Sequence, residues 1–251
     1  MKFFKRYLKL GWGNFLRLLA LKKFGASQVK IDLNDGKGPL LLQDGSMDYR
    51  LFSDIFLYEN YNLNLAQTPA YIMDCGANTG ISTRYFVKKY PLAKFAAIEP
   101  DQRNFGLLKK NLEGSGAALF QAAIHNERKQ LQLAGDDLSS YSRRFVETGH
   151  GSESVAAMPL QDVFEKLGWP GIDLLKIDIE GGETAMFDTQ DPWLSKVNVF
   201  VIEFHEYLKP GATQTILSKI FSTGEFRIHT QAEYMVLERL NWINHPAESR
   251  R

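Results

Sequence analysis

One stretch of ten residues, Tyr71–Gly80, constrains the fold of this chain more than any other. Its apolar start is typical of a strand buried in a parallel sheet. Gly76 then allows a turn with positive φ or a close approach to the backbone, and Gly80 leaves room for the next helix to pack on the strand. Residues 81–90 have the pattern of that helix. A strand, a glycine turn and a helix in this order predict the nucleotide-binding corner of a doubly wound α/β sheet.

A second predicted strand, Lys94–Glu99, ends in an acidic residue 25 positions after Asp74. A carboxylate at this place can accept hydrogen bonds from both hydroxyls of a ribose. NAD is one candidate ligand, but its G-x-G-x-x-G fingerprint needs a middle glycine, which is absent between Gly76 and Gly80. Asp74 would also bring a negative charge near the diphosphate. S-adenosylmethionine has a sulfonium, an amino group and a ribose but no phosphate, so it is the favoured cofactor.

Four segments carry a resemblance to a known family: Asp74–Gly80, Glu99–Pro100, Asp173–Gly181 with Glu183, and Val201–His205. They resemble the FkbM family of class I S-adenosylmethionine-dependent methyltransferases. The resemblance covers roughly Val29 to His205, and the pattern from Lys176 to Glu183 is its most specific part. It implies O-methylation of a hydroxyl on a sugar or a secondary metabolite, with S-adenosylmethionine as the cofactor.

The expected fold is α/β, a Rossmann-like class I methyltransferase fold with a mostly parallel doubly wound sheet. Further strands are expected at 117–125, 172–179 and 197–204, followed by an antiparallel C-terminal strand pair at 225–229 and 234–239. The expected units are an N-terminal helix and hairpin extension packed on the core (1–66), the methyltransferase domain (67–240) and a C-terminal tail (241–251).

Ligands of an open α/β sheet bind at the carboxyl ends of its strands. The predicted strand ends should therefore meet along one edge of the sheet, and they are Asp74, Glu99, Ala123–Ile124, Asp178 and His205. Convergence of separate segments is the main physical argument for a site at this edge.

The residues expected to bind the cofactor are Asp74, Gly76, Asn78, Gly80, Glu99, Ala123 and Asp178. Asp74 would receive the amino group, although it can also cap the following helix. The two glycines and Asn78 would shape the loop beneath the methionine part. Glu99 would hold the ribose, and Ala123 would leave space for the adenine ring.

The expected catalytic residues are Asp178, Glu180 and His205. The two carboxylates flank Ile179 and would project to the same side if the strand continues that far. His205 is the preferred general base, because an unperturbed histidine has a pKa of ~6.5, and Glu180 is the next base to consider. The alternatives are a structural ion pair of the carboxylates with Lys176 and a hydrogen-bonded histidine at a strand end. The two carboxylates could also bind a divalent metal, but no full set of metal ligands is visible in the sequence, so no metal is assigned and this interpretation is the weaker one.

The net charge of the 251-residue chain is +1, which gives no sign of nucleic-acid binding. Residues 1–31 are locally basic, with eight Lys and Arg and no acidic residue before Asp32. Two interpretations remain: helices packed on the catalytic domain, which we favour, and an amphipathic helix on an anionic membrane surface. We expect a cytoplasmic protein. Peripheral membrane contact through the basic N-terminal segment is the alternative.

The acceptor is expected to be a small molecule with a hydroxyl, and a carbohydrate fits this description. One alternative is methylation of another nucleophile, such as an amine, a protein or a lipid headgroup. Another is a degenerate fold that only binds a cofactor or a partner. The sequence does not indicate an oligomeric state.

Overall fold

The structure is a computed structural model that describes residues 10–24, 27–43, 45–134, 144–147, 152–189 and 192–244. Its helical elements are α2 (Trp12–Phe24), α3 (Gly45–Phe52), the π-helix η1 (Ser53–Leu57), α4 (Ile81–Lys89), α5 (Gln102–Asn111), α6 (Leu160–Leu167), α7 (Glu183–Phe187), the 3₁₀ helix η2 (Pro192–Lys196), α8 (Ala212–Phe221) and α9 (Leu240–Asn244). The start of the basic arm (1–9) and most of the expected tail (245–251) lie outside the described residues.

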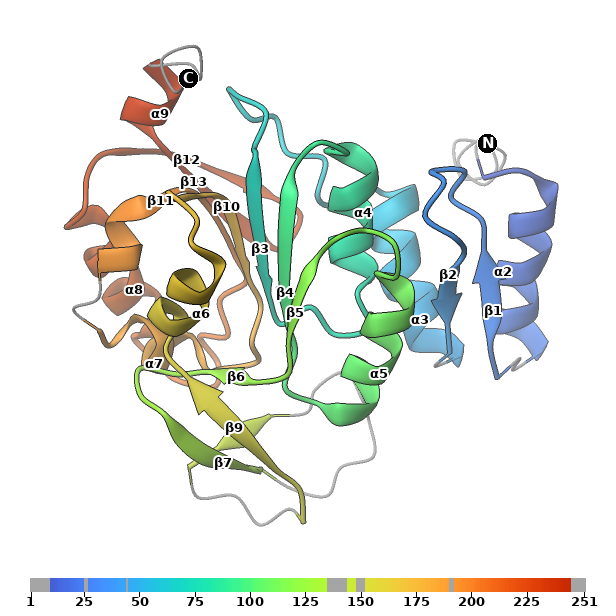
Figure 1. Cartoon of the computed structure of the whole chain (residues 1–251), viewed down its shortest axis with the longest axis horizontal. Coiled ribbons are helices and arrows are strands. Elements are labelled where there is room, and N and C mark those ends of the chain that lie inside the picture. Colours follow the sequence, from blue (N-terminus) through green and yellow to red (C-terminus); the bar gives the residue numbers. More distant parts are fainter. Residues whose placement is uncertain are drawn as a thin grey trace.

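Seven strands form the central sheet in the order β12-β13-β11-β10-β3-β4-β5 (Figure 1). They are β3 (Tyr71–Cys75), β4 (Lys94–Ile98), β5 (Ala118–Phe120), β10 (Ile172–Ile177), β11 (Val197–Ile202), β12 (Phe226–Gln231) and β13 (Tyr234–Arg239). The five strands from β11 to β5 are parallel, whereas β13 runs antiparallel to both β11 and β12. This confirms the predicted Rossmann-like fold with its antiparallel C-terminal pair. From β3 the chain first adds β4 and β5 on one side and later β10 and β11 on the other, so the strand order reverses between β3 and β10. Such a switch point is the usual ligand position in an open parallel sheet.

Apolar side chains cover both faces of the sheet, which explains the unbroken apolar runs of the central strands. In β3, Ile72 belongs to the core beneath α4 and α5, and Met73 belongs to the opposite core beneath α6, α7 and α8. Both side chains are almost fully buried. The sheet is therefore the middle of three layers, and only its edges are available for binding.

The predicted third strand, 117–125, is two strands in two different sheets. β5 belongs to the central sheet, whereas β6 (Ala123–Ile124) pairs with β9 (Ser154–Met158) in a second sheet of order β6-β9-β7-β8. The other members of that sheet are β7 (Lys129–Leu133) and β8 (Phe145–Val146). The predicted fourth and fifth strands are also shorter than expected and end at Ile177 and Ile202.

The N-terminal segment consists of α2, the hairpin of β1 (Val29–Ile31) and β2 (Leu40–Leu42), and α3 with η1. Arg84 of α4 is fully buried and holds the hairpin turn, because its guanidinium donates to Asp35 Oδ1 (2.7 Å) and to the carbonyl oxygen of Gly38 (2.7 Å). Asn14 of α2 bonds both the amide and the carbonyl of Asp32. The Arg84 contacts fix the hairpin to α4 of the core, and the Asn14 contacts fix α2 to the hairpin.

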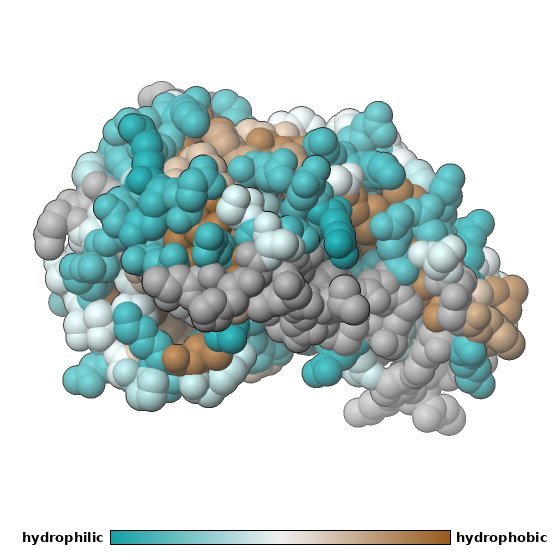
Figure 2. Space-filling view, turned by 90° about the horizontal axis from the view of Figure 1, so that it is seen from below, coloured by the Kyte–Doolittle hydropathy of each residue, from teal (hydrophilic) through white to brown (hydrophobic). Residues whose placement is uncertain are grey.

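Three large apolar side chains of α2 are exposed. Trp12, Leu16 and Phe24 have exposed fractions of 61%, 58% and 79%. Figure 2 shows apolar residues at the end of the molecule that α2 occupies. Among the described residues, no helix combines the length and apolarity needed to cross a bilayer.

Candidate active site

A cavity of about 620 Å³ lies at the carboxyl ends of the parallel strands, beside the switch between β3 and β10. Its lining includes most of the residues that the sequence predicted, namely Gly76, Asn78, Glu99, Ala123, Asp178, Glu180 and His205. Asp74 and Gly80 are not part of the lining. The convergence of separate strand ends is therefore present, with two of the predicted residues set beneath the surface.

The two glycines of the β3–α4 loop have different constraints. Gly76 has φ 78°, and a Cβ built there would lie 1.7 Å from the carbonyl oxygen of Asp178. Both features expected of Gly76, a positive φ and a close approach to its backbone, are thus present. The group that approaches is the backbone carbonyl of Asp178. Gly80 has φ 85°, and its missing side chain would face Leu108 of α5 at an ordinary 3.5 Å rather than strand β3. Gly80 is therefore required mainly for its left-handed conformation.

Asp74 is completely buried and already bonded by the protein. Its Oδ2 accepts hydrogen bonds from the hydroxyls of Ser82 and Thr83, both at 2.7 Å. Its Oδ1 lies 3.1 Å from Nζ of Lys176. Burial by itself lowers the pKa of Lys176, but Asp74 and Asp178 outweigh burial and raise that pKa above its usual value. Asp74 therefore ties the start of α4 to Lys176, and its carboxylate does not reach the cavity.

Glu99 faces the cavity although only 5% of it is exposed. Its carboxylate accepts hydrogen bonds from the amides of Asn78 (2.8 Å) and Asp101 (3.0 Å). Burial raises the pKa of Glu99 to about 7, although the two amide N–H groups act in the opposite direction. Asn78 has φ 50°, and its buried Oδ1 has no hydrogen-bond partner among the described residues. Acceptors for hydroxyl and amino donors are thus present at this end of the cavity.

His205 is 6% exposed and lies at the opposite end of the cavity lining, beyond β11. Its Nδ1 is 2.8 Å from Oε1 of Glu183, and its Nε2 is 3.5 Å from Oε2 of Glu180 and 4.0 Å from Oδ1 of Asp178. Burial would lower the pKa of His205, but its hydrogen bond with Glu183 and the surrounding carboxylates raise that pKa to about 9. The structure thus brings together all three residues predicted to be catalytic.

The route by which Asp178 and Glu180 reach His205 differs from the predicted one. β10 ends at Ile177, so the two residues do not alternate along a strand. The chain turns instead, with Glu180 in the left-handed region at φ 53° and Gly181 at φ 94°. Burial raises the pKa of Glu180, and the neighbouring Asp178 raises it further.

Sequence reasoning did not assign a site role to Glu183 or Glu203. Glu183 begins α7, is 3% exposed, and accepts from the amide of Gly181 at 3.2 Å as well as contacting His205. Glu203 lines the cavity, and burial raises its pKa to about 7, with a further contribution from Asp178. Two features of the sequence could have pointed to these residues. Glu183 belongs to the segment that resembles the family, and Glu203 stands two residues before His205.

The sequence matches the Methyltransferase FkbM domain over residues 74–227, which is more than half of the chain. The chain belongs to the FkbM methyltransferase family. This confirms the resemblance found in the sequence, and the matched region contains every predicted site residue. The α/β fold with its mostly parallel sheet is the one that this resemblance predicted.

Two curated relatives are similar over part of this family member. The AMB antimetabolite synthetase AmbE of Pseudomonas aeruginosa is 26% identical over 235 residues, which cover 74% of this chain and 11% of that protein. The methyltransferase sdnD of Sordaria araneosa is 28% identical over 177 residues, which cover 56% of this chain and 68% of that protein. The chain therefore spans only about a tenth of the length of the synthetase.

Solved methyltransferase structures are more distant. A precorrin-6y C5,15-methyltransferase from Geobacter metallireducens has a TM-score of 0.40 and 14% identity, with 72% of this chain and 83% of that chain covered. The O-methyltransferase TomG from Streptomyces achromogenes has a TM-score of 0.38 and 9% identity, with 76% and 80% covered. At such TM-scores neither similarity bears on the acceptor.

Proposed function

We propose that this FkbM family member transfers a methyl group from S-adenosylmethionine to a hydroxyl of a small molecule. The observation that carries the proposal is the division of one cavity into two chemically different ends. Glu99 and Asn78 present acceptor oxygens at one end, and His205 with Asp178 and Glu180 forms a polar cluster at the other. A donor and an acceptor can thus be held in the same enclosed space.

The donor end fits the proposed cofactor. The Glu99 carboxylate is oriented by two backbone amides, so it is preorganised to accept from ribose hydroxyls. The unpartnered Oδ1 of Asn78 suits an amino group. Ala122 and Ala123 leave room beside β6 for a planar base. Asp74 supports this end from beneath by holding Ser82 and Lys176, whereas the sequence predicted that it receives the amino group directly or through water.

The charge of the lining also favours a cationic cofactor over a dinucleotide. The acidic residues of the lining are Asp54, Glu99, Glu147, Asp178, Glu180, Glu203 and Glu233, whereas the only Lys or Arg residues among the described lining are Arg50 and Lys176. A diphosphate would meet a surplus of like charge here. A sulfonium would be attracted, and a neutral polyhydroxyl acceptor such as a sugar would find many hydrogen-bond acceptors.

At the acceptor end, the proposed task of His205, Asp178 and Glu180 is to hold the acceptor hydroxyl and to take its proton. His205 can take the proton only in its neutral form, which becomes populated as the pH approaches its raised pKa of about 9. S-adenosylmethionine, when bound, supplies the sulfonium methyl group. Methyl transfer needs alignment above all, and positioning alone contributes a large part of the acceleration in such reactions. Proton acceptance by a side chain adds ~10²–10⁴-fold. Glu183 keeps the imidazole of His205 in place through the 2.8 Å contact.

The proposal is tested by incubating the protein with methyl-labelled S-adenosylmethionine and fractionated small-molecule extracts. Label should appear in a neutral methyl ether that resists conditions which cleave methyl esters. In parallel, calorimetry should show binding of S-adenosylhomocysteine and none of NAD. Label in an amine product would replace the hydroxyl acceptor, and NAD binding without S-adenosylhomocysteine binding would overturn the cofactor.

A further inference from the structure

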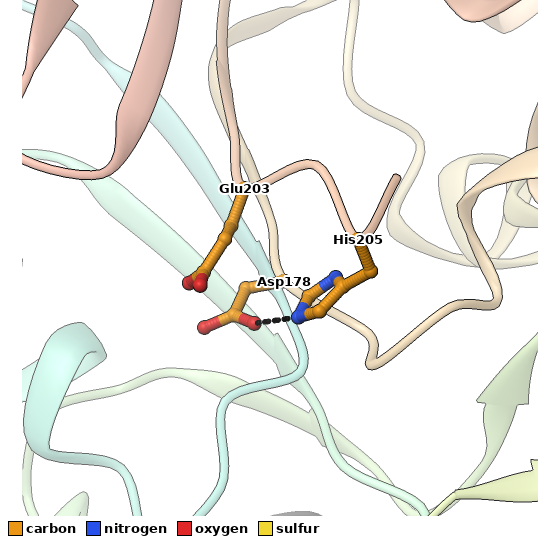
Figure 3. A group of neighbouring side chains, drawn as sticks. All are labelled: Asp178, Glu203 and His205. Carbon is orange, nitrogen blue, oxygen red and sulfur yellow. Dashed lines mark ion pairs between the residues drawn. The ribbon is translucent and has the colours of Figure 1, made fainter. Parts of the chain in front are cut away.

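Three side chains converge on one point of the cavity wall. Asp178 follows β10, and Glu203 and His205 follow β11 (Figure 3). One potential ligand atom from each lies within 4.8 Å of the others. We infer that Asp178, Glu203 and His205 form a binding site for a divalent cation. The sequence alone predicted no metal, because nothing in it shows that Glu203 joins the other two residues.

The orientation of His205 supports this inference. A carboxylate can only accept, so the 2.8 Å contact with Glu183 requires Nδ1 of His205 to donate. Nε2 then points at the cluster, and within the described residues it makes no hydrogen bond of its own. The imidazole is 6% exposed, so this nitrogen is withdrawn from bulk water. A histidine that donates one N–H to a buried carboxylate while presenting its other nitrogen is the usual arrangement of a metal-binding histidine.

The two carboxylates each have an oxygen available. Asp178 divides its oxygens, since Oδ2 lies 3.5 Å from Nζ of Lys176 whereas Oδ1 faces His205. In the part of the chain that the structure describes, the carboxylate of Glu203 makes no hydrogen bond and no ion pair. A half-buried carboxylate with no hydrogen bond and no ion pair is costly, and a cation between Glu203, Asp178 and His205 would reduce that cost.

The ligand chemistry defines the kind of cation. Two carboxylate oxygens and one imidazole nitrogen leave further coordination positions open toward the cavity, as in sites that bind a substrate oxygen. Oxygen ligands suit Mg²⁺ and Mn²⁺, and the nitrogen favours the transition metal, so Mn²⁺ is the appropriate probe.

The purpose of the cation rests on the proposed function. A hydroxyl bound at an open position would be polarised and made more acidic by the metal charge. His205 would then serve as a ligand, and Glu180, whose Oε2 is 3.5 Å from Nε2, would be the neighbouring proton acceptor. The cation would thereby select acceptors with a hydroxyl that can reach it.

The experiment titrates the full chain with Mn²⁺ alone and follows the loss of the free Mn²⁺ signal by electron paramagnetic resonance. The wild type should bind one Mn²⁺ per chain, and spin-echo spectra should show coupling to an imidazole nitrogen. Asp178→Asn and Glu203→Gln should weaken binding at least about tenfold. His205→Gln should abolish the nitrogen coupling. Glu113→Gln, which changes an exposed acid outside the cavity lining, should leave the affinity within about twofold.

Circular dichroism checks that each variant is folded, and Glu203→Gln keeps the test decisive if another variant is not. Absence of Mn²⁺ binding at millimolar concentration would overturn the inference, as would equal binding by wild type and Glu203→Gln or a bound ion without nitrogen coupling. Binding of S-adenosylhomocysteine is measured separately on the same samples without metal. If the wild type did not bind S-adenosylhomocysteine, the proposed function would be contradicted, whereas the cation result would still stand.

Discussion

Nδ1 of His205 lies 2.8 Å from Oε1 of Glu183, and both residues are more than nine-tenths buried. The contact joins the loop after β11 to the first residue of α7. Glu183 also accepts from the amide of Gly181, so one carboxylate fixes both the imidazole and the turn that carries Glu180. The geometry of the acceptor end therefore depends on a residue that need not touch the acceptor.

Glu183→Gln tests this dependence. The amide keeps an oxygen for the N–H groups of Gly181 and His205 but loses the charge, so the fold should be retained. We expect Mn²⁺ affinity to fall ~10–100-fold, as for other changes behind a metal-binding histidine, while S-adenosylhomocysteine affinity stays within about threefold. Calorimetry with both ligands measures this. Unchanged Mn²⁺ affinity would show that Glu183 only holds the turn.

His205→Ala should separate binding from turnover. Because His205 is at the acceptor end, the variant should retain S-adenosylhomocysteine affinity within about threefold but lose turnover by ~10²-fold or more. Initial rates with labelled cofactor on the true acceptor measure the loss. The control is His229→Ala, a histidine of edge strand β12 outside the cavity lining. Normal turnover in His205→Ala would assign His205 a structural role and make Glu180 the next residue to test.

Cofactor affinity should depend on pH through Glu99. Burial raises its pKa to about 7, and only the ionised carboxylate accepts from both ribose hydroxyls. S-adenosylhomocysteine affinity should therefore be full above this pKa and fall as the pH drops through it, by up to about tenfold per unit. Calorimetry between pH 5.5 and 8.5 gives the profile. Glu99→Gln should bind more weakly at all pH values and lack the inflection, and a flat wild-type profile would contradict the ribose role.

Gly76→Ala and Gly80→Ala should differ sharply in stability. A Cβ at residue 76 would overlap the backbone carbonyl of Asp178 at 1.7 Å, so we expect a loss of more than ~3 kcal/mol or failure to fold. At residue 80 the space is adequate, and the left-handed φ of 85° should cost ~1–2 kcal/mol. Urea denaturation measures both. Equal losses would show that the close approach at Gly76 relaxes readily.

Deletion of residues 1–24 should lower stability, because Leu18 and Leu21 of α2 are almost fully buried. Loss of this packing predicts a melting temperature roughly 10 °C lower. The matched control is Trp12→Ser with Leu16→Ser on the exposed face, which should melt within about 2 °C of the wild type. A truncated protein of normal stability that no longer sediments with anionic vesicles would favour the membrane interpretation instead.

The sheet and the donor end were predictable because their signals are local. The glycine turn after Cys75 and the acid at Glu99 depend on short patterns with fixed spacing. The split of 117–125 into β5 and β6 was not predictable in this way. A mostly apolar run interrupted only by Gln121 does not show that the chain changes sheets after Phe120, since the pairing partner of β6 lies more than thirty residues later in β9.

The acceptor end was predictable in part. Asp178 and His205 follow apolar strands, so their sheet edge could be inferred. The burial of Asp74 could not, because it results from Ser82 and Thr83 on α4 and from Lys176 on β10. The place of Glu203 beside Asp178 and His205 was equally unpredictable, because it depends on how the segments after β10 and β11 fold.

The acceptor end of the cavity has walls from outside the region that defines the family. Arg50, Asp54 and Tyr61 come from before residue 74, and Glu233 and Tyr234 come from after residue 227. Tyr61 and Tyr234 pack together with ring centroids 4.7 Å apart, so these flanking segments form one joint surface. On the proposed function, these two flanks would contribute to the choice of acceptor, and exchanging them together would be the way to change that choice.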